Sequence, residues 1–276
     1  MKQPTSPPPT QPQSPYHFDS SVSPLPPPIT HGASCLSAAA KRYKYLRRVI
    51  HFSQMDFEFA LWQMLYLFIA PQKVYRDFHY RKQTKAQFAR DDPAFLVLLS
   101  GWIIVSSACF ALVLRLGVGG FLVFLLYVFT VDTLLIGAVI ATALWLLSNR
   151  YLRHSPDTGQ DVEWGFSFDV HLNAFFPSLI ILHIVQILLY RAFLVQDGFL
   201  SHLVGNVLWT VAIGYYIYIT FLGYSALPFL KNTRVFLYPL TLLALMFVAV
   251  TASGVNLSRT LMEFYRYRVL ASSNWL

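Results

Sequence analysis

Long hydrophobic runs with almost no charged residues dominate the chain from residue 94 onward. They predict five transmembrane helices, at residues 94–114, 121–147, 174–195, 203–227 and 235–257. Each run is as long as the roughly 20 residues that a helix needs to cross the hydrocarbon core. Helices are expected rather than strands, because an isolated strand leaves its backbone groups without partners in lipid. We therefore predict an all-α fold, with a five-helix transmembrane bundle over residues 93–258.

A shorter hydrophobic stretch precedes these runs, at residues 55–70. It contains Asp56 and Glu58, and Pro71 follows it. It is too short for a span, so two placements are open: a helix in the headgroup layer, or a helix packed against the bundle. A re-entrant insertion would alter the topology. We predict an additional N-terminal interfacial amphipathic helix within a basic-aromatic segment, residues 41–92.

The composition supports a membrane protein. Of the 276 residues, 55% are hydrophobic and 12% are charged, whereas soluble domains carry about 25% charged residues. Residues 1–40 hold most of the 16 prolines and no long hydrophobic run, which predicts a disordered, Pro-rich cytosolic tail. The two cysteines stand in this tail (Cys35) and in a hydrophobic run (Cys109), which argues against a disulfide framework.

The distribution of lysines and arginines predicts the orientation. They concentrate before residue 93 and in the links after the second and fourth runs. The other side holds only Arg115, Arg191, Arg259, Arg266 and Arg268. Because positive residues are retained in the cytosol, we predict a cytosolic N-terminus. Five spans then make residues 259–276 a lumenal C-terminal tail.

Asp132 lies near the middle of the second run. An acid inside the membrane is costly and is therefore a functional-site candidate. Its predicted partners are His183 and Gln186 in the third run and Asn206 in the fourth. Two interpretations are open. Asp132 could hold helices together through hydrogen bonds, or it could act with His183 in a small transporter or lipid-handling protein.

The densest polar cluster, at residues 161–173, comes just before the third run. Asp169 and His171 could bind a metal or act as an acid–base pair, and an enzyme would also need Glu163 at the same site. The alternative is a hydrogen-bonded cap for the third helix, with Pro177 near the start of that helix. The spacing fits no established motif, so we expect no enzymatic activity, catalytic residue, metal or cofactor.

The basic-aromatic segment 41–92 suits three kinds of partner. Anionic lipid would gain about 1 kcal/mol from each basic residue near its surface. A cytosolic protein could bind the segment, and so could RNA, whose bases stack on aromatic side chains. The candidate partner- or lipid-facing residues are Lys41, Arg42, Arg47, Arg48, Trp62, Arg76, Arg81, Lys82, Lys85, Glu163, Trp164, Asp169 and His171.

Several sequence motifs resemble those of a known family. They are KRYKYLRR (41–48), QMDFEFA (54–60), WQMLYL (62–67), HYRKQTK (79–85), ARDDPAF (89–95), DVEWG (161–165), FDVHLNAF (168–175), and GYYIY (214–218) through KNT (231–233). Over about residues 40–270, the chain resembles the uncoordinated-50 family of Golgi membrane proteins. The Pro-rich tail departs from this pattern.

The resemblance implies a five-span protein of the Golgi and early secretory pathway, without known catalytic activity. It implies a trafficking role, in which the protein recruits large Arf-type guanine nucleotide exchange factors and supports the surface delivery of receptor cargo, including nicotinic receptors. RNA binding has also been attached to the family. The endoplasmic reticulum and the inner nuclear membrane are further expected locations.

Overall fold

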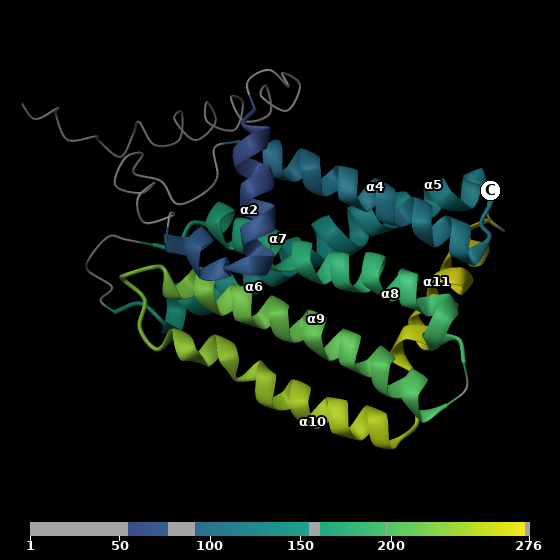
Figure 1. Ribbon diagram of the computed structural model, residues 1–276. Coiled ribbons are helices and arrows are strands. Elements are labelled where there is room, and N and C mark those ends of the chain that lie inside the picture. Colours follow the sequence, from purple (N-terminus) through teal and green to yellow (C-terminus); the bar gives the residue numbers. More distant parts are fainter. Residues whose placement is uncertain (1–54, 77–91, 155–160, 197, 274–276) are drawn as a thin grey trace, which may run out of the picture. The chain divides into compact units, whose positions relative to one another are not determined.

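The computed structural model describes residues 55–76, 92–154, 161–196 and 198–273, which are almost entirely helical. The principal α-helices are α2 (Phe57–Ile69), α4 (Ala94–Leu114), α5 (Val118–Tyr127), α6 (Ile136–Tyr151), α7 (Trp164–Ile180), α8 (Gln186–Leu189), α9 (Phe199–Ser225), α10 (Pro239–Ala252) and α11 (Leu257–Ser273) (Figure 1). Residues 71–76 are also helical. The π-helical segments η2 (Val128–Leu135), η4 (Ile181–Val185) and η5 (Tyr190–Leu194) continue α-helices, and η6 (Thr233–Leu237) is a 3-10 helix.

Five helical segments of the described chain are long and apolar enough to cross a membrane. They are residues 94–114, 118–151, 164–194, 199–225 and 233–252. The predicted all-α, multi-pass fold is therefore confirmed, and the shorter apolar helix α2 precedes the five segments. In the second and third segments, π-helical turns join the α-helical parts without interrupting the helix.

The third segment differs most from its predicted bounds, since it begins at residue 164 rather than 174. The sequence suggests a polar link here because Asp169, His171 and Asn173 interrupt the hydrophobic pattern. In the structure these three side chains face the interior of the helix bundle, where all three are buried. A helix can carry polar residues through the bundle when other helices supply their partners.

The remaining boundaries shift by a few residues. The second segment is longer than predicted, at 118–151 instead of 121–147, and the fourth is 199–225 instead of 203–227. The fifth is 233–252 instead of 235–257, because α10 gives way to a turn in which Gly254 adopts a left-handed conformation with φ of 72°. Residues 257–273, predicted to belong largely to a tail, form helix α11.

Pro177 lies inside α7, four residues before η4, and not at the start of a helix as its sequence context predicts. A proline has no N–H to donate to the carbonyl one turn earlier, so it disturbs regular α-helical hydrogen bonding. The π-helical segment that follows accommodates this disturbance while the helix continues across the bundle.

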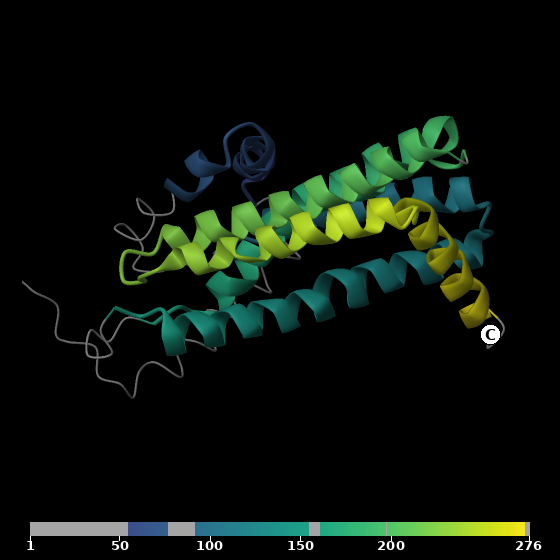
Figure 2. The same ribbon diagram turned by 90° about the horizontal axis from the view of Figure 1, so that it is seen from below.

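The helices of the bundle run roughly side by side, and their ends gather in two regions (Figures 1 and 2). We call the region where α4, α7 and α10 begin the near end, and the region where α4 and α10 finish the far end. Helix α7 is the most enclosed of the spans and packs against α2, α6 and α9. Helix α10 lies at the periphery, packs mainly on α9 and has no buried residue.

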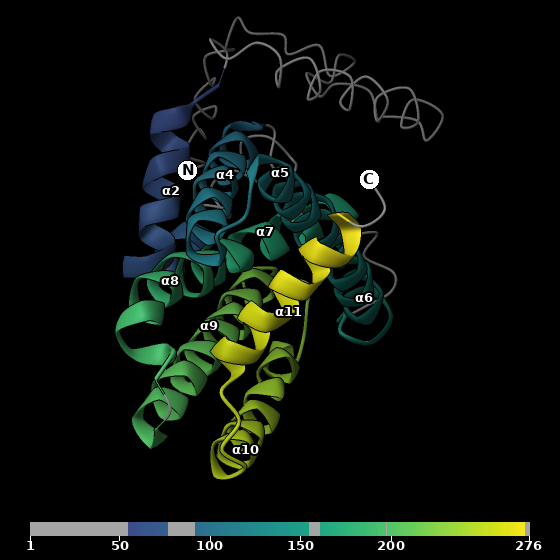
Figure 3. The same ribbon diagram turned by 90° about the vertical axis from the view of Figure 1, so that its right-hand side faces the viewer.

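Two helices cross the direction of the others. Helix α2 lies across the bundle close to the start of α4 (Figure 1). The backbone N–H of Asp56 donates to the Asp92 carboxylate at 2.8 Å, and that carboxylate also accepts from the N–H of Ala94 at 3.0 Å. Helix α11 crosses the far end from α10 toward α5 (Figure 3).

Candidate functional site

Helix α2 is fixed to the bundle by one buried face. Ala60, Gln63, Met64 and Leu67 are buried on this face. The side-chain amide of Gln63 donates to the Asn173 carbonyl oxygen of α7 at 3.2 Å. The Tyr215 hydroxyl of α9 lies 2.8 Å from the Leu67 carbonyl and 2.9 Å from the Phe68 carbonyl. Because the last carbonyls of a helix have no partners within the helix, Tyr215 caps α2 with a donor from the bundle.

The opposite face of α2 is exposed and largely apolar, with Glu58 as its charged residue. Its outward apolar side chains are Phe59, Leu61, Trp62, Leu65, Phe68 and Ile69. Trp62 is 51% exposed, and its indole stacks on Tyr66. The helix is therefore packed against the bundle by one face, while its second apolar face stays exposed, and the headgroup-layer placement remains a prediction.

Helices α7 and α9 continue well past α2 at the near end. From Asn173, which contacts α2, to the start of α7 at Trp164 is about 14 Å at the rise of an α-helix. From Tyr215 to the end of α9 at Ser225 is about 15 Å by the same measure. We call the part beyond α2 the overhang: residues 145–154, 161–169 and 219–234. Its ends are seen beyond α2 in Figure 1.

Hydrogen bonds hold two chain segments of the overhang together, the end of α6 and the start of α7. The Trp145 indole N–H and the Asn149 amide both donate to the Val162 carbonyl, at 2.8 and 3.0 Å. The Val162 N–H donates back to Asn149 at 2.9 Å, and Arg153 pairs with Asp161 at 2.9 Å. These contacts fix the start of α7 against the end of α6.

The links after the second and fourth spans are also joined to each other. The Lys231 N–H donates to the Leu152 carbonyl at 2.7 Å, and the His154 N–H donates to the Phe229 carbonyl at 3.0 Å. Arg153 and Leu230 form an isolated antiparallel bridge between these two bonds. Two chain segments about 75 residues apart, from position 153 to position 230, therefore form one surface.

Basic and aromatic side chains project from this surface. Tyr151 is 65% exposed and Trp164 is 43% exposed, and Arg150, Lys231 and Arg234 are also exposed within the overhang. Trp164 is held in place, because its ring stacks on Phe168 and its N–H donates to Thr142 at 3.0 Å. The sequence predicts a cytosolic face that includes the links 161–173 and 228–234, and therefore Trp164, Lys231 and Arg234. Arg150 serves there only to predict the orientation.

The prediction that Asp169 and His171 face a partner is wrong, because both side chains are buried. The His171 ring hydrogen-bonds the Tyr216 hydroxyl at 2.7 Å and lies against Gly137. Glu163, by contrast, is exposed, so these three residues do not share one exposed site. The described residues contain no cluster of three or more His, Cys, Asp or Glu side chains that could hold a metal ion.

Of the predicted basic candidate residues, only Arg76 is among the described residues. Arg76 is exposed, and near it the Lys73 ammonium lies 5.3 Å from the centre of the Tyr66 ring. Lys41, Arg42, Arg47, Arg48, Arg81, Lys82 and Lys85 lie outside the described residues.

The partner of Asp132 in the described chain is Arg268 of α11, and the prediction of His183, Gln186 or Asn206 is wrong. The guanidinium and the carboxylate are 3.5 Å apart, and both side chains are partly buried. The guanidinium carbon also lies 3.2 Å from the centre of the Tyr127 ring. The acid of the second span thus has a cation of α11 beside it, and the pair joins that span to α11.

His183 and Tyr265 form part of an aromatic layer under α11. The rings of Phe110 and His183 are 4.9 Å apart, and Tyr265 lies 5.6 Å from Phe110 and 5.2 Å from Phe124. Burial raises the pKa of Tyr265, and the nearby Asp132 carboxylate raises it further, while Arg268 opposes the change. The Tyr265 phenol is therefore kept protonated within this layer.

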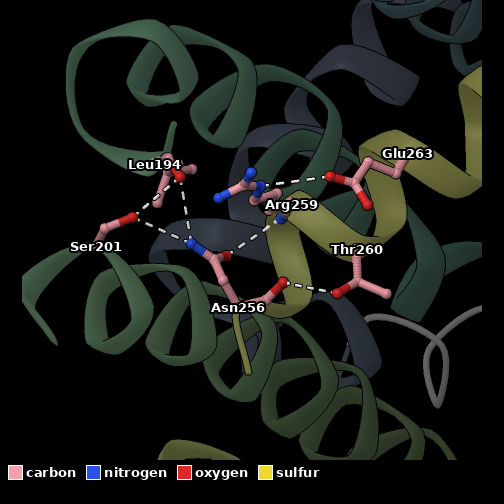
Figure 4. A network of polar contacts seen from close by, with 6 residues as sticks. All are labelled: Leu194, Ser201, Asn256, Arg259, Thr260 and Glu263. Atoms are coloured by element: carbon pink, nitrogen blue, oxygen red, sulfur yellow. Dashed lines mark hydrogen bonds and ion pairs between the residues drawn. The ribbon is translucent and has the colours of Figure 1, made fainter. Parts of the chain in front are cut away.

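Two asparagines hold the turn between α10 and α11, and Figure 4 shows the contacts of one of them, Asn256. The Asn256 amide donates to the Leu194 carbonyl at 3.2 Å and to the Ser201 hydroxyl at 3.0 Å, and its oxygen accepts from the Arg259 N–H. Asn206 of α9 donates to the Val255 carbonyl at 3.0 Å and accepts from the Leu257 N–H at 3.1 Å. Asn206 therefore anchors the turn that leads into α11.

Comparison with known proteins assigns the chain to a family. The model of the UNC-50 family matches residues 45–266. The chain is 58% identical over 235 residues to Protein unc-50 homolog of Danio rerio, covering 84% of this chain and 91% of that protein. It is 55% identical over 247 residues to Protein unc-50 homolog of Drosophila melanogaster, covering 90% of each.

Protein unc-50 homolog of Homo sapiens is 58% identical over 233 residues, which cover 84% of this chain and 90% of that protein. No solved structure matches the chain significantly. The matched region contains all five membrane-crossing helices, α2 and the overhang. This chain is therefore a multi-pass membrane protein that belongs to the UNC-50 family.

Proposed function

We propose that this protein acts without catalysis in vesicular protein trafficking at the Golgi and in the early secretory pathway. In this role it recruits an Arf guanine nucleotide exchange factor to the cytosolic face of the membrane, and thereby aids the cell-surface delivery of receptors such as nicotinic receptors. Its membership of the UNC-50 family supports the proposal, because the family resemblance implies this role.

The overhang is the observation that carries the proposal. Its two links are joined by backbone hydrogen bonds, and its exposed residues include Arg150, Tyr151, Trp164, Lys231 and Arg234. Arginine and large aromatic residues are the types that most often dominate protein–protein binding energy. A rigid surface also loses little conformational entropy when a partner binds. The predicted cytosolic orientation of the near end would expose this surface to a soluble exchange factor.

A binding experiment with the full-length protein in lipid nanodiscs tests the proposal. Reversing the charges of Arg150, Lys231 and Arg234 to Glu should lower the capture of a large Arf exchange factor by about tenfold or more, equivalent to at least about 1.4 kcal/mol. Arg266→Glu on the exposed face of α11 is the matched control, because it reverses a charge at the other end of the bundle.

A second variant separates the two basic surfaces. Reversing Arg81, Lys82 and Lys85 tests the segment 41–92, which the sequence also predicts to face the partner. Capture that survives the overhang variant but is lost in this second variant would move the binding surface away from the overhang. Failure of the unaltered protein to capture the exchange factor would refute direct recruitment.

A further inference from the structure

A hollow lies on the outer surface of the bundle, between α4 and the segment formed by α5 and η2. Its volume is about 530 Å³. It is lined by Ser100 and Ile104 of α4 and by Leu122, Leu125, Leu126 and Phe129 of the neighbouring segment. This volume is within the range of about 300–1,000 Å³ that is typical of small-molecule sites.

The hollow is located in the membrane-crossing part of the protein, since both of its walls belong to spans. Its lining residues are about one helical turn apart along each wall, as Ser100 and Ile104 are on α4. Leu122, Leu126 and Phe129 have similar spacing on the other wall. The hollow therefore runs along the helices, which is also the average direction of lipid chains in a bilayer.

The chemistry of the lining restricts what can fill the hollow. Five of the six lining residues are hydrocarbon side chains. The sixth, Ser100, donates its hydroxyl hydrogen to the Leu96 carbonyl at 2.8 Å, as part of its own helix. A bound water needs about two to four polar partners, which this lining does not offer. An empty hollow would lose the dispersion contacts of the side chains around it.

We propose that the hollow is a binding site for one hydrocarbon chain of a membrane phospholipid. The chain is supplied by the surrounding bilayer, and the lining makes van der Waals contact with it along its length. A flexible chain can follow the leucine-lined wall, and it requires no polar partner at this depth. The site is independent of the overhang, so this proposal does not rely on recruitment of an exchange factor.

Photochemical labelling of the full-length protein tests the proposal. The protein is reconstituted in phosphatidylcholine vesicles that contain a trace of phosphatidylcholine with a diazirine on one acyl chain. After illumination, labelled residues are identified by mass spectrometry. Label should concentrate on the lining residues of α4, α5 and η2, and exceed the label per exposed residue on α10, whose Leu242, Leu245 and Val248 are exposed.

Two variants fill the hollow from opposite walls, Ser100→Phe and Leu126→Trp. Each should reduce labelling of the remaining lining residues to the level on α10. Leu112→Phe is the matched control on α4, because Leu112 is 77% exposed and does not line the hollow. Having two filling variants guards against misfolding of either one, which size-exclusion chromatography would reveal.

Several outcomes would overturn the proposal. Label spread evenly over α4, α5 and α10 would show ordinary contact with bulk lipid. Label at the lining that neither correctly folded filling variant reduces would show that the hollow holds no chain. A photoactivatable residue at position 126 gives a further test. If it formed a crosslink to a second protein molecule, and the lining carried no lipid label, the hollow would be a protein interface.

Discussion

Single polar residues fasten helices of this protein that lie far apart in the sequence. Asn256 and Asn206 illustrate this, since their amides satisfy backbone groups at the turn before α11. A buried amide that makes its hydrogen bonds is tolerated, whereas one that loses them costs about 1–3 kcal/mol. The turn is therefore sensitive to any atom that displaces Asn256.

Gly205→Ala should destabilise the protein by about 1–3 kcal/mol, as overpacking typically does. The added methyl carbon would lie 2.8 Å from the Asn256 side-chain oxygen and 3.1 Å from the Ser258 hydroxyl. The measurement is the apparent melting temperature of the detergent-solubilised protein, read by fluorescence-detected size-exclusion chromatography.

Gly101→Ala is the matched control for that substitution. Gly101 also lies within a helix, but no atom outside its own helix backbone stands within 4 Å of the added carbon. Since alanine is favoured over glycine in a helix by about 0.5–1 kcal/mol, this variant should be as stable as the parent or slightly more so. Equal melting temperatures for the two variants would contradict the role of close packing at Gly205.

Sequence and structure agree about Asp132 only in part. An acid within a hydrophobic run is conspicuous in the sequence, and the need for a partner follows from its cost. The identity of the partner could not be predicted, because Arg268 lies in a segment whose charges are typical of a solvated tail. Only the folding of α11 across the far end brings the two residues to 3.5 Å.

At the scale of elements, α11 is an amphipathic helix that faces the bundle with one side. Ser258, Met262, Tyr265 and Val269 are buried at spacings of three or four residues, which is helical periodicity. Its exposed side carries Phe264 and Tyr267. Tyrosine is enriched at membrane–water interfaces, so this helix is suited to the boundary of the bilayer at the far end.

Arg268→Ala should destabilise the docking of α11 by about 1–3 kcal/mol, because it leaves Asp132 without its cation. Replacing both partners, as Asp132→Leu with Arg268→Met, should be less harmful than Arg268→Ala alone, because no unpaired charge remains. Hydrogen exchange of the α11 amides, followed by mass spectrometry, measures the docking directly.

Arg266→Ala provides the comparison on the same helix, since Arg266 is exposed and its loss should leave exchange unchanged. If the α11 amides of Arg268→Ala exchanged hydrogen at the parental rate, the ion pair would have no part in docking. A double variant that exchanged faster than Arg268→Ala would mean that shape at these positions matters more than charge.

The spans themselves could be predicted from hydrophobic length, and the first one has the same bounds in the sequence and the structure. The start of α7 could not, because Asp169, His171 and Asn173 interrupt the hydrophobic pattern for a reason that depends on other helices. Asn173 meets Gln63 of α2, and His171 meets Tyr216 of α9. A hydrophobic pattern indicates which residues face lipid. It therefore underestimates the length of a helix that is enclosed by protein.

For the whole molecule, the orientation in the membrane remains a prediction from the basic residues. Five spans and a cytosolic N-terminus place a tag after residue 276 in the lumen. In sealed microsomes, external protease should remove an N-terminal tag and leave the C-terminal tag intact until detergent is added. Digestion of the C-terminal tag in intact vesicles would refute either the number of spans or the orientation.

For the candidate surface too, one part could be predicted from the sequence and another part could not. A basic, aromatic near end is foreseeable from the charge distribution along the chain. The links 161–173 and 228–234 could be placed on this face from the sequence. The pairing of Leu152 and His154 with Lys231 and Phe229 could not. Pairing between links that are distant in sequence leaves no periodic signal, so only the folded bundle reveals which basic residues are neighbours.

The pairing of Asp132 with Arg268 also has a consequence for the order of events during synthesis. A chain is made from its N-terminus, so Asp132 enters the translocon well before the ribosome has made Arg268. The phenylalanines and asparagine that receive α11, Phe110, Phe124 and Asn206, also precede it in the chain. During this interval the acid is without its cation, which makes its insertion costly. Docking of α11 therefore closes the described bundle only after the spans that receive it have been made.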